Sequence, residues 1–204
     1  MMITFLRQAK ILAAGALSAA FIFVIGMAFI KHTEPDRQEQ PLQIELEPVP
    51  DCVEAIRPEP ARFRRNTHMP EANEAVVSGP IKDPGFSPGR DLIYIDDNRV
   101  RWESDNDKGD TEDDHTIHKS MEIPLRRLIN LVCNEGGTLK IQDTYRPSGI
   151  HNTRSLHKEG RAIDLTAKNL SLERLAKLAW AAGFDWVYYE TRGGHHIHCS
   201  VKRQ

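Results

Sequence analysis

The sequence SLHKEGRAID at residues 155–164, followed by HIH at residues 196–198, decides the type of domain and the chemistry that we predict for this chain. His157, Asp164 and His198 supply two imidazoles and one carboxylate, a mixture of ligands that zinc accepts. A zinc ion with three protein ligands keeps its fourth position open for water, as in catalytic rather than structural sites. The spacing therefore predicts a metal centre of the hydrolytic type. The alternative is a chance grouping, because the chain contains nine histidines.

Two further residues are predicted to border this metal centre. His196 precedes His198 by two positions on a predicted strand, so both side chains point to one face. Glu190 follows a predicted strand at residues 186–189 and is the best candidate for the base that moves a proton from a zinc-bound water to the leaving group. The alternative for Glu190 is a solvated glutamate at a strand end.

Residues 143–158 are predicted to form a long polar loop that leads to the first metal ligand. Arg146 lies in this loop, and its guanidinium can hold a substrate carboxylate through two hydrogen bonds. His151 precedes His157 by six residues and is expected to rim the same cleft, where it either stabilises an oxyanion or only forms a hydrogen bond. The alternative for Arg146 is an ordinary surface arginine.

The remaining pattern predicts a small α+β domain. Apolar faces indicate two helices, which begin near Pro124 and Ser171 and end before Gly136 and Gly183. Residues 92–95 and 100–102 are expected to pair as a hairpin, and further strands are expected at residues 139–142, 162–165, 186–189 and 196–201. Because helices and strands alternate, we expect a small mixed or antiparallel sheet with two packed helices.

An uninterrupted apolar run at residues 11–30 is long enough to span a membrane as a helix. Basic residues precede the run, which places residues 1–10 in the cytoplasm and the rest of the chain outside. We interpret the run as a transmembrane signal anchor, with a cleaved signal peptide as the alternative. Residues 31–90 are expected to be a proline-rich exported linker, and residues 91–204 the zinc domain. The predicted location is a single-pass inner or plasma membrane, with the domain periplasmic or extracellular.

Composition limits the partners that we expect. The formal net charge is −2, and no basic stripe with interleaved aromatic residues indicates binding to nucleic acid. The three cysteines, Cys52, Cys133 and Cys199, are an odd number, so at least one has no partner within the chain. We expect Cys133 and Cys199 to be buried free thiols. The expected partners are a peptide substrate and, through residues 11–30, a membrane.

Three segments of this chain resemble the Hedgehog N-terminal signalling domain. They are LHKEGRAID (156–164), AGFDWVYYE (182–190) and HIHCSV (196–201). That family shares its fold and zinc site with D-Ala-D-Ala metallopeptidases, which trim bacterial cell-wall peptides. The resemblance implies zinc on His157, Asp164 and His198, with Glu190 as base and with His151 and His196 lining the cleft.

The motif around Arg146 is similar to those metallopeptidases, in which the arginine faces the terminal carboxylate of the substrate. Together with the predicted anchor, it favours a bacterial-type, membrane-anchored member. The segment between Glu190 and HIH is longer by two residues than in the Hedgehog pattern, which affects the expected position of Glu190.

Animal Hedgehog domains also bind calcium through acidic residues in two loops. In this chain the acidic stretch at residues 103–107 supplies one side and Asp143 one more ligand, but Arg146 and Ser148 stand where further acids are expected. Calcium takes six to eight oxygen ligands. Calcium is therefore doubtful, and a solvated acidic loop is the favoured interpretation.

We therefore predict a membrane-tethered zinc peptidase that hydrolyses cell-wall peptides, as a D-Ala-D-Ala-type carboxypeptidase or an endopeptidase. The alternative is a non-catalytic, zinc-stabilised Hedgehog-like module for binding or signalling, since a hydrolase site can be kept for stability or recognition.

Overall fold

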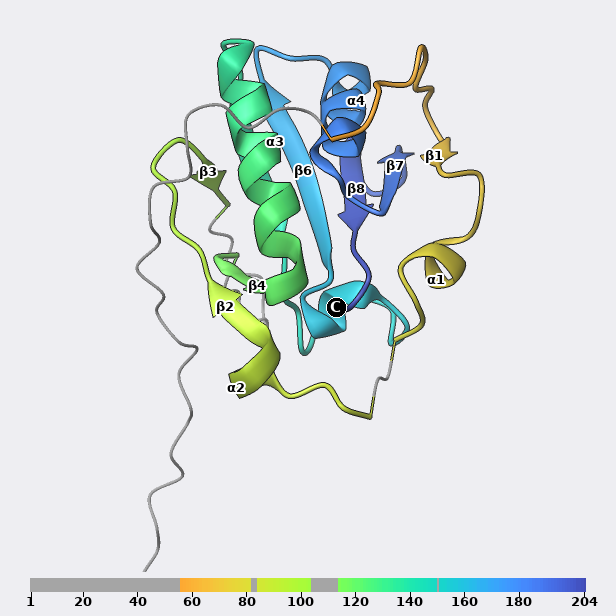
Figure 1. Cartoon of the computed structure of the whole chain (residues 1–204), viewed down its shortest axis with the longest axis vertical. Coiled ribbons are helices and arrows are strands. Elements are labelled where there is room, and N and C mark those ends of the chain that lie inside the picture. Colours follow the sequence, from red (N-terminus) through yellow and green to blue (C-terminus); the bar gives the residue numbers. More distant parts are fainter. Residues whose placement is uncertain (1–55, 82–83, 104–113, 150) are drawn as a thin grey trace, which may run out of the picture. The chain divides into compact units, whose positions relative to one another are not determined.

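A six-stranded mixed sheet organises the chain. The computed structural model describes residues 56–81, 84–103, 114–149 and 151–204. The strand order is β1-β7-β8-β6-β5-β3, in which β3 and β5 are parallel and the other neighbours are antiparallel. The strands are β1 (His68–Met69), β3 (Arg101–Trp102), β5 (Thr138–Asp143), β6 (Ala162–Lys168), β7 (Trp186–Glu190) and β8 (His196–Ser200) (Figure 1). The predicted α+β class is confirmed.

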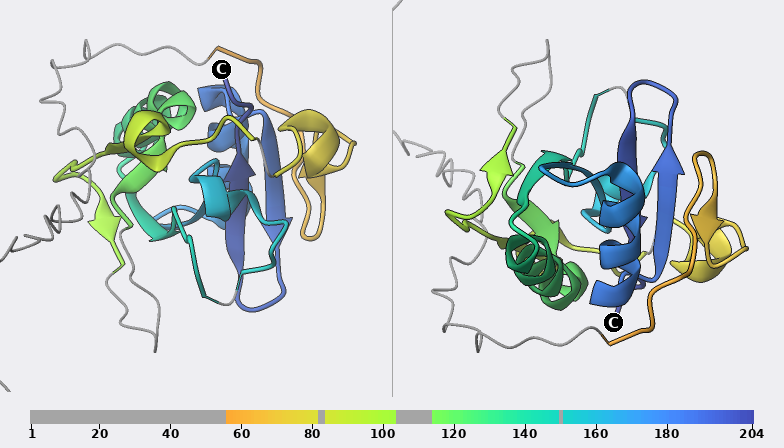
Figure 2. Two further views of the ribbon diagram at one scale, coloured as in Figure 1. Left: turned by 90° about the horizontal axis from the view of Figure 1, so that it is seen from below. Right: turned by 90° about the horizontal axis from the view of Figure 1, so that it is seen from above.

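Two helices cover one face of this sheet. α3 (Glu122–Asn134) and α4 (Leu172–Ala182) lie side by side and pack against the central strands (Figures 1 and 2). The hydroxyl of Ser171 accepts a hydrogen bond from the backbone nitrogen of Arg174 at 3.1 Å, which caps the start of α4. Gly183 ends α4 with φ of 104°, a conformation that favours glycine. Both helix predictions are therefore confirmed.

A second sheet pairs β2 (Leu92–Tyr94) with β4 (Thr116–His118) in antiparallel register. The prediction of a hairpin between residues 92–95 and 100–102 is therefore wrong. The chain does turn at Asp97, but β3 then pairs with β5 in the large sheet. Strand β4 buries all three of its residues beside β2. The alternation of apolar residues does not reveal that β2 pairs with β4, because β4 follows only after an acidic segment of the sequence.

The strands alternate so that apolar side chains enter the core and polar side chains stay on the face opposite the helices. On β8, Ile197 and Cys199 belong to the buried core, whereas His196 and His198 are only partly buried. Val187 and Tyr189 on β7 also belong to the core. Because side chains of a strand point to alternate faces, Trp186, Tyr188 and Glu190 share the face of His198.

The N-terminal part of the fold begins earlier than residue 91, where we expected the domain to start. β1 pairs with β7 as an edge strand, and α1 (Glu74–Val77) and α2 (Pro88–Asp91) follow. We call residues 68–80 the N-terminal strap. Arg161 fixes it, because its guanidinium donates to the carbonyl oxygens of Ser78 and Pro80. A two-residue strand and a four-residue helix are too short to give a periodic signal, so the sequence of the strap resembles that of a linker.

The predicted transmembrane segment at residues 11–30 lies outside the described residues, as do Cys52 and the acidic residues 104–113. Within the described ranges, no helix is both long and apolar enough to cross a membrane. Cys133 and Cys199 are free thiols, of which Cys199 is buried and Cys133 is partly exposed.

Candidate metal centre

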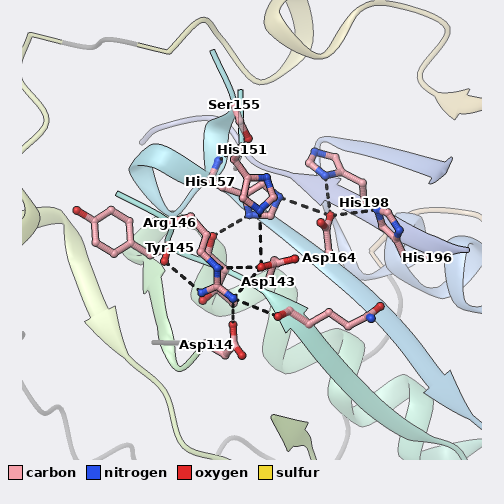
Figure 3. A network of polar contacts seen from close by, with 12 residues as sticks. Asp114, Asp143, Tyr145, Arg146, His151, Ser155, His157, Asp164, His196 and His198 are labelled. Atoms are coloured by element: carbon pink, nitrogen blue, oxygen red, sulfur yellow. Dashed lines mark hydrogen bonds and ion pairs between the residues drawn. The ribbon is translucent and has the colours of Figure 1, made fainter. Parts of the chain in front are cut away.

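His157, Asp164 and His198 come together at the polar face of the sheet. Each offers one potential ligand atom, and these atoms all lie within 4.8 Å of one another. The three residues come from different elements: the 3-10 helix η2 (Leu156–Glu159), β6 and β8. Asp164 and His198 stand directly opposite each other in the β6–β8 register. The predicted grouping is therefore present, as Figure 3 shows.

The tautomer of His157 suits a metal ligand. Its Nδ1 lies 2.8 Å from the carbonyl oxygen of Thr144, which requires that nitrogen to donate. Its Nε2 then carries a lone pair, is buried, and has no hydrogen-bond partner among the described residues. That atom lies 3.5 Å from Oδ1 of Asp164. A buried nitrogen without a partner, fixed from behind by a carbonyl, is the arrangement expected of a zinc ligand.

The η2 turn that carries His157 ends at Gly160. Ser155 starts the turn by accepting a hydrogen bond from the backbone nitrogen of His157 at 3.3 Å. Gly160 has φ of 65°, and an added Cβ would lie 2.9 Å from the backbone nitrogen of His118. Glycine is therefore required there, which gives a physical reason for the Gly160-Arg161 pair in the motif.

Asp164 and His198 form a strongly coupled pair. Nδ1 of His198 lies 2.7 Å from Oδ1 of Asp164. Burial by itself would raise the pKa of Asp164, but the neighbouring His157 and His198 hold it well below its usual value. Burial would lower the pKa of His198, but Asp164 and Glu74 raise it well above its usual value. Asp164 thus keeps its negative charge beside a protonated His198, and a metal ion that bound here would replace the proton on Nδ1 of that ring.

Glu74 of the N-terminal strap is a site residue that the sequence did not reveal. Its Oε1 lies 2.8 Å from Nε2 of His198, on the ring edge opposite Asp164. Burial would raise the pKa of Glu74, but the hydrogen bond with His198 lowers it. A carboxylate behind a metal-binding imidazole fixes the tautomer and orientation of the ring. The available signal was weak: Asn73 before an apolar stretch and Gly79 after it mark a short helix.

The structure also places the predicted bordering residues near the centre. Nε2 of His196 lies 3.6 Å from Oδ1 of Asp164 and 3.6 Å from Oε2 of Glu190. His151 packs its ring against that of His157, with 4.4 Å between the ring centroids. Their catalytic roles stay predictions, but Glu190 and His196 stand opposite each other in the β7–β8 register.

Arg146 lies elsewhere than its predicted role requires. Its side chain is 0% exposed, and its guanidinium is paired with Asp143 and Asp114. In this structure the guanidinium binds carboxylates of the chain itself, so it does not face a cleft where a substrate carboxylate would lie. The sequence shows that the loop contains a charged arginine, but it does not show whether that side chain is buried.

The described residues do not fit a calcium site between the two loops. Glu103 is paired with Lys140 at 2.5 Å, and Asp143 is paired with Arg146 at 2.7 Å. Calcium takes six to eight oxygen ligands, and a guanidinium among the expected ligands repels a second cation. By contrast, the nitrogen and carboxylate donors of the metal centre fit zinc.

The fold and site define a domain with a three-ligand metal centre on the polar face of a mixed sheet. The family of Hedgehog amino-terminal signalling domains matches residues 62–200, and the chain belongs to this family. Indian hedgehog B protein of Danio rerio is 39% identical over 126 residues, covering 59% of this chain and 27% of the relative. Protein hedgehog of Drosophila ananassae is 34% identical over 134 residues, covering 62% and 27%. The chain thus spans about a quarter of the length of these curated relatives.

These findings correct the predicted location. We expected a single-pass membrane protein with an exported catalytic domain. That prediction is wrong, because the chain belongs to a family of signalling domains and the relatives that it matches are hedgehog proteins. The prediction of a membrane location rested only on the length of the apolar run at residues 11–30 and on the charges that flank it.

Proposed function

We propose that this chain is a zinc-stabilised Hedgehog-like module for binding or signalling. The observation that supports it is the metal centre itself, whose three ligands come from η2, β6 and β8, inside a family of signalling domains. His157, Asp164 and His198 would hold the zinc ion, whose positive charge would tie a loop to two strands. Such a centre stiffens the surface around it, which favours recognition because less order must be gained on binding.

The surface beside the metal centre has the chemistry of a recognition site. The rings of Trp186 and His198 lie 5.9 Å apart, and His68 stacks on Trp186 at 5.1 Å. Tyr188 lies next to Trp186, with 5.5 Å between the ring centroids. Aromatic residues are enriched at protein interfaces. Trp186 itself is buried, whereas His68 and Tyr188 are partly exposed, so a partner that presents apolar or aromatic groups would meet these two rings beside the metal centre.

A second candidate function is zinc-dependent hydrolysis of peptide bonds. The observation that favours it is the contact between Glu190 and His196, which in turn approaches Asp164. Zinc, when bound, would supply a water of lowered pKa. Glu190 would then accept the proton and His196 or His151 would hold the developing oxyanion. Cell-wall peptides are the substrate that this candidate predicts. The guanidinium of Arg146, however, is buried and paired with Asp114 and Asp143 rather than placed to bind their carboxylate.

Mass spectrometry of peptides after incubation with the zinc-loaded chain separates the two candidates. The wild-type chain and the Glu190→Gln variant would be incubated side by side with purified cell-wall peptides and with mixed unrelated peptides. The binding module predicts no zinc-dependent product from either protein. A product that requires zinc and disappears in Glu190→Gln would establish the hydrolase and overturn the first proposal.

A positive test for binding uses peptides displayed from a random library and selected on the zinc-loaded chain. Enriched peptides should bind the wild type and lose binding to a His198→Ala variant or after chelation. Tyr188→Ala should weaken the same peptides while leaving zinc affinity unchanged. Peptides that bind equally with and without zinc would contradict a recognition surface built around the metal.

A further inference from the structure

A second cluster of charged groups lies next to the metal centre. It consists of Asp114, Asp143 and Arg146 together with the carbonyl oxygens of Gln142 and Tyr145, and we call it the arginine cage. Arg146 donates from Nε to Oδ1 of Asp143 at 2.8 Å and from Nη2 to Oδ1 of Asp114 at 2.6 Å. The same guanidinium approaches the carbonyl oxygens of Gln142 at 3.3 Å and Tyr145 at 3.5 Å. Figure 3 shows Arg146 with Asp114, Asp143 and Tyr145.

The cage joins two segments that are far apart in the sequence. Asp114 precedes β4, whereas Asp143 ends β5, and the guanidinium spans the space between them. The side chains of Arg146 and Asp114 are 0% and 1% exposed. A register shift between Ile141 and Asp143 brings Asp143 opposite Asp164 on the face of the metal centre. Such bulges re-aim side chains next to functional sites.

Carboxylate and carbonyl oxygens are the ligands that calcium prefers. Here they surround a group that keeps its positive charge at any accessible pH. Burial by itself would raise the pKa of Asp143, but His151 and Arg146 hold it below its usual value. The cage thus supplies to a buried guanidinium the oxygen ligands that a divalent ion would otherwise need.

We infer that Arg146 is the built-in cation of the arginine cage. Its guanidinium joins Asp114, before β4, to Asp143, at the end of β5, without a divalent metal ion. The inference concerns a site separate from the zinc ligands and does not depend on which proposed function is correct. It makes calcium unnecessary for stability and predicts that calcium does not regulate the metal centre.

The cage also supports the zinc ligand His157. The backbone nitrogen of Arg146 donates to the carbonyl oxygen of His157 at 2.9 Å. Asp143 lies 3.6 Å from Nε2 of His151, whose ring packs on His157. A built-in cation therefore holds the loop around the metal centre in place at any calcium concentration.

Thermal unfolding of the full chain with and without calcium tests the inference. The proteins are the wild type, Arg146→Ala, Arg146→Lys and Arg154→Ala, which removes an exposed arginine of the same loop. The wild type and Arg154→Ala should show no change in Tm with about 5 mM calcium, a concentration that saturates even weak protein sites. Arg146→Ala should lose about 10 °C, because the buried Asp114 and the partly buried Asp143 both lose the guanidinium.

Calcium should restore part of the lost Tm in Arg146→Ala, since the emptied cage then presents paired carboxylates to a divalent ion. Arg146→Lys should fall between the wild type and Arg146→Ala, because one ammonium cannot reproduce the planar fork.

Calorimetric titration of the wild type with calcium gives a result that does not depend on any variant folding. Heat of binding together with a calcium-dependent rise in Tm would overturn the inference. An unchanged Tm in Arg146→Ala would also overturn it. If Arg146→Ala does not fold at all, the titration of the wild type and the Tm of Arg146→Lys decide the outcome.

Discussion

The metal centre and the arginine cage are neighbouring cation sites that obtain their positive charge in different ways. The metal centre gathers two imidazoles and a carboxylate and leaves Nε2 of His157 buried without a partner among the described residues. The cage gathers two carboxylates around a guanidinium that belongs to the chain. The first therefore suits an external ion, and the second contains its cation already.

This difference shows that acidic residues in a loop do not by themselves indicate a metal site. Asp143 and Asp164 stand opposite each other in the β5–β6 register. Asp164 faces imidazoles that can bind a metal, whereas Asp143 faces Arg146. Two carboxylates in neighbouring positions thus serve different cations, because three histidines surround Asp164 whereas a guanidinium lies against Asp143.

The largest effect is expected when the metal centre loses its carboxylate. Asp164→Asn should weaken zinc binding about 1,000-fold, because an anionic ligand becomes a neutral amide. Chelator competition would measure the affinity, and an exposed Asp96→Asn variant is the control. Zinc binding that survives in Asp164→Asn would show that the centre uses other ligands. Asp164 would then not be the carboxylate that distinguishes the metal centre from the arginine cage.

The second-largest effect is expected from acid, through the buried side chain of His118. Its contribution to the pH dependence of stability must be known before a pH titration can compare the two cation sites. Burial lowers the pKa of His118 from 6.5 to about 4, against the opposing charge of Asp91. Its Nδ1 accepts a hydrogen bond from the backbone nitrogen of Ser120 at 3.1 Å, which requires the neutral ring. Between these pKa values the unfolded chain binds a proton that the folded chain does not. Stability should therefore fall as the pH drops from about 6.5 to about 4, by about 3 kcal/mol.

His118→Asn is the matched variant for this prediction, since an amide oxygen can accept the same hydrogen bond without titrating. Urea unfolding from pH 7 to pH 4 should show a shallower decline for the variant than for the wild type. Parallel declines would place the acid sensitivity elsewhere, with Asp164 and His198 as the groups to study next.

The metal ligands were predictable because their signal is local and periodic. HIH on a strand places two imidazoles on one face, and β8 has this alternation. The spacing from His157 to Asp164 spans one turn and the start of a strand, so their proximity required little knowledge of the tertiary fold. His198 joins these two residues only through the pairing of β6 with β8, so its place in the predicted group depended on the tertiary fold.

Glu74 and the cage could not be predicted in the same way. Glu74 reaches His198 only because β1 pairs with β7 and Arg161 fixes the strap, and neither contact leaves a periodic pattern. The role of Arg146 depends on Asp114, which is 32 residues away in the sequence. A motif shows which charges are present, but burial and distant partners decide which cation each carboxylate binds.

A smaller effect is expected when Glu74 loses its charge. Glu74→Gln should weaken zinc binding by about 10- to 100-fold, because a neutral amide holds the tautomer and orientation of the His198 ring less firmly than a carboxylate. Glu71→Gln is the control, since Glu71 is an exposed acid in the same strap. Chelator competition gives the affinity, and the Tm should fall less in zinc-free protein than in zinc-loaded protein. An equal loss of Tm in zinc-free protein would mean that Glu74 supports the fold rather than the metal centre.

The smallest effect is expected at the ion pair between Glu103 and Lys140, which joins β5 to the residue after β3. The two side chains lie 2.5 Å apart but are 25% and 34% exposed. Lys140→Met should cost less than about 1 kcal/mol in urea unfolding, because water solvates both charges after the pair is lost. The same measurement on Arg146→Ala should give about 3 to 5 kcal/mol. If the two variants lost equal stability, the buried guanidinium would contribute no more to stability than an exposed ion pair does, and burial would not explain the cage.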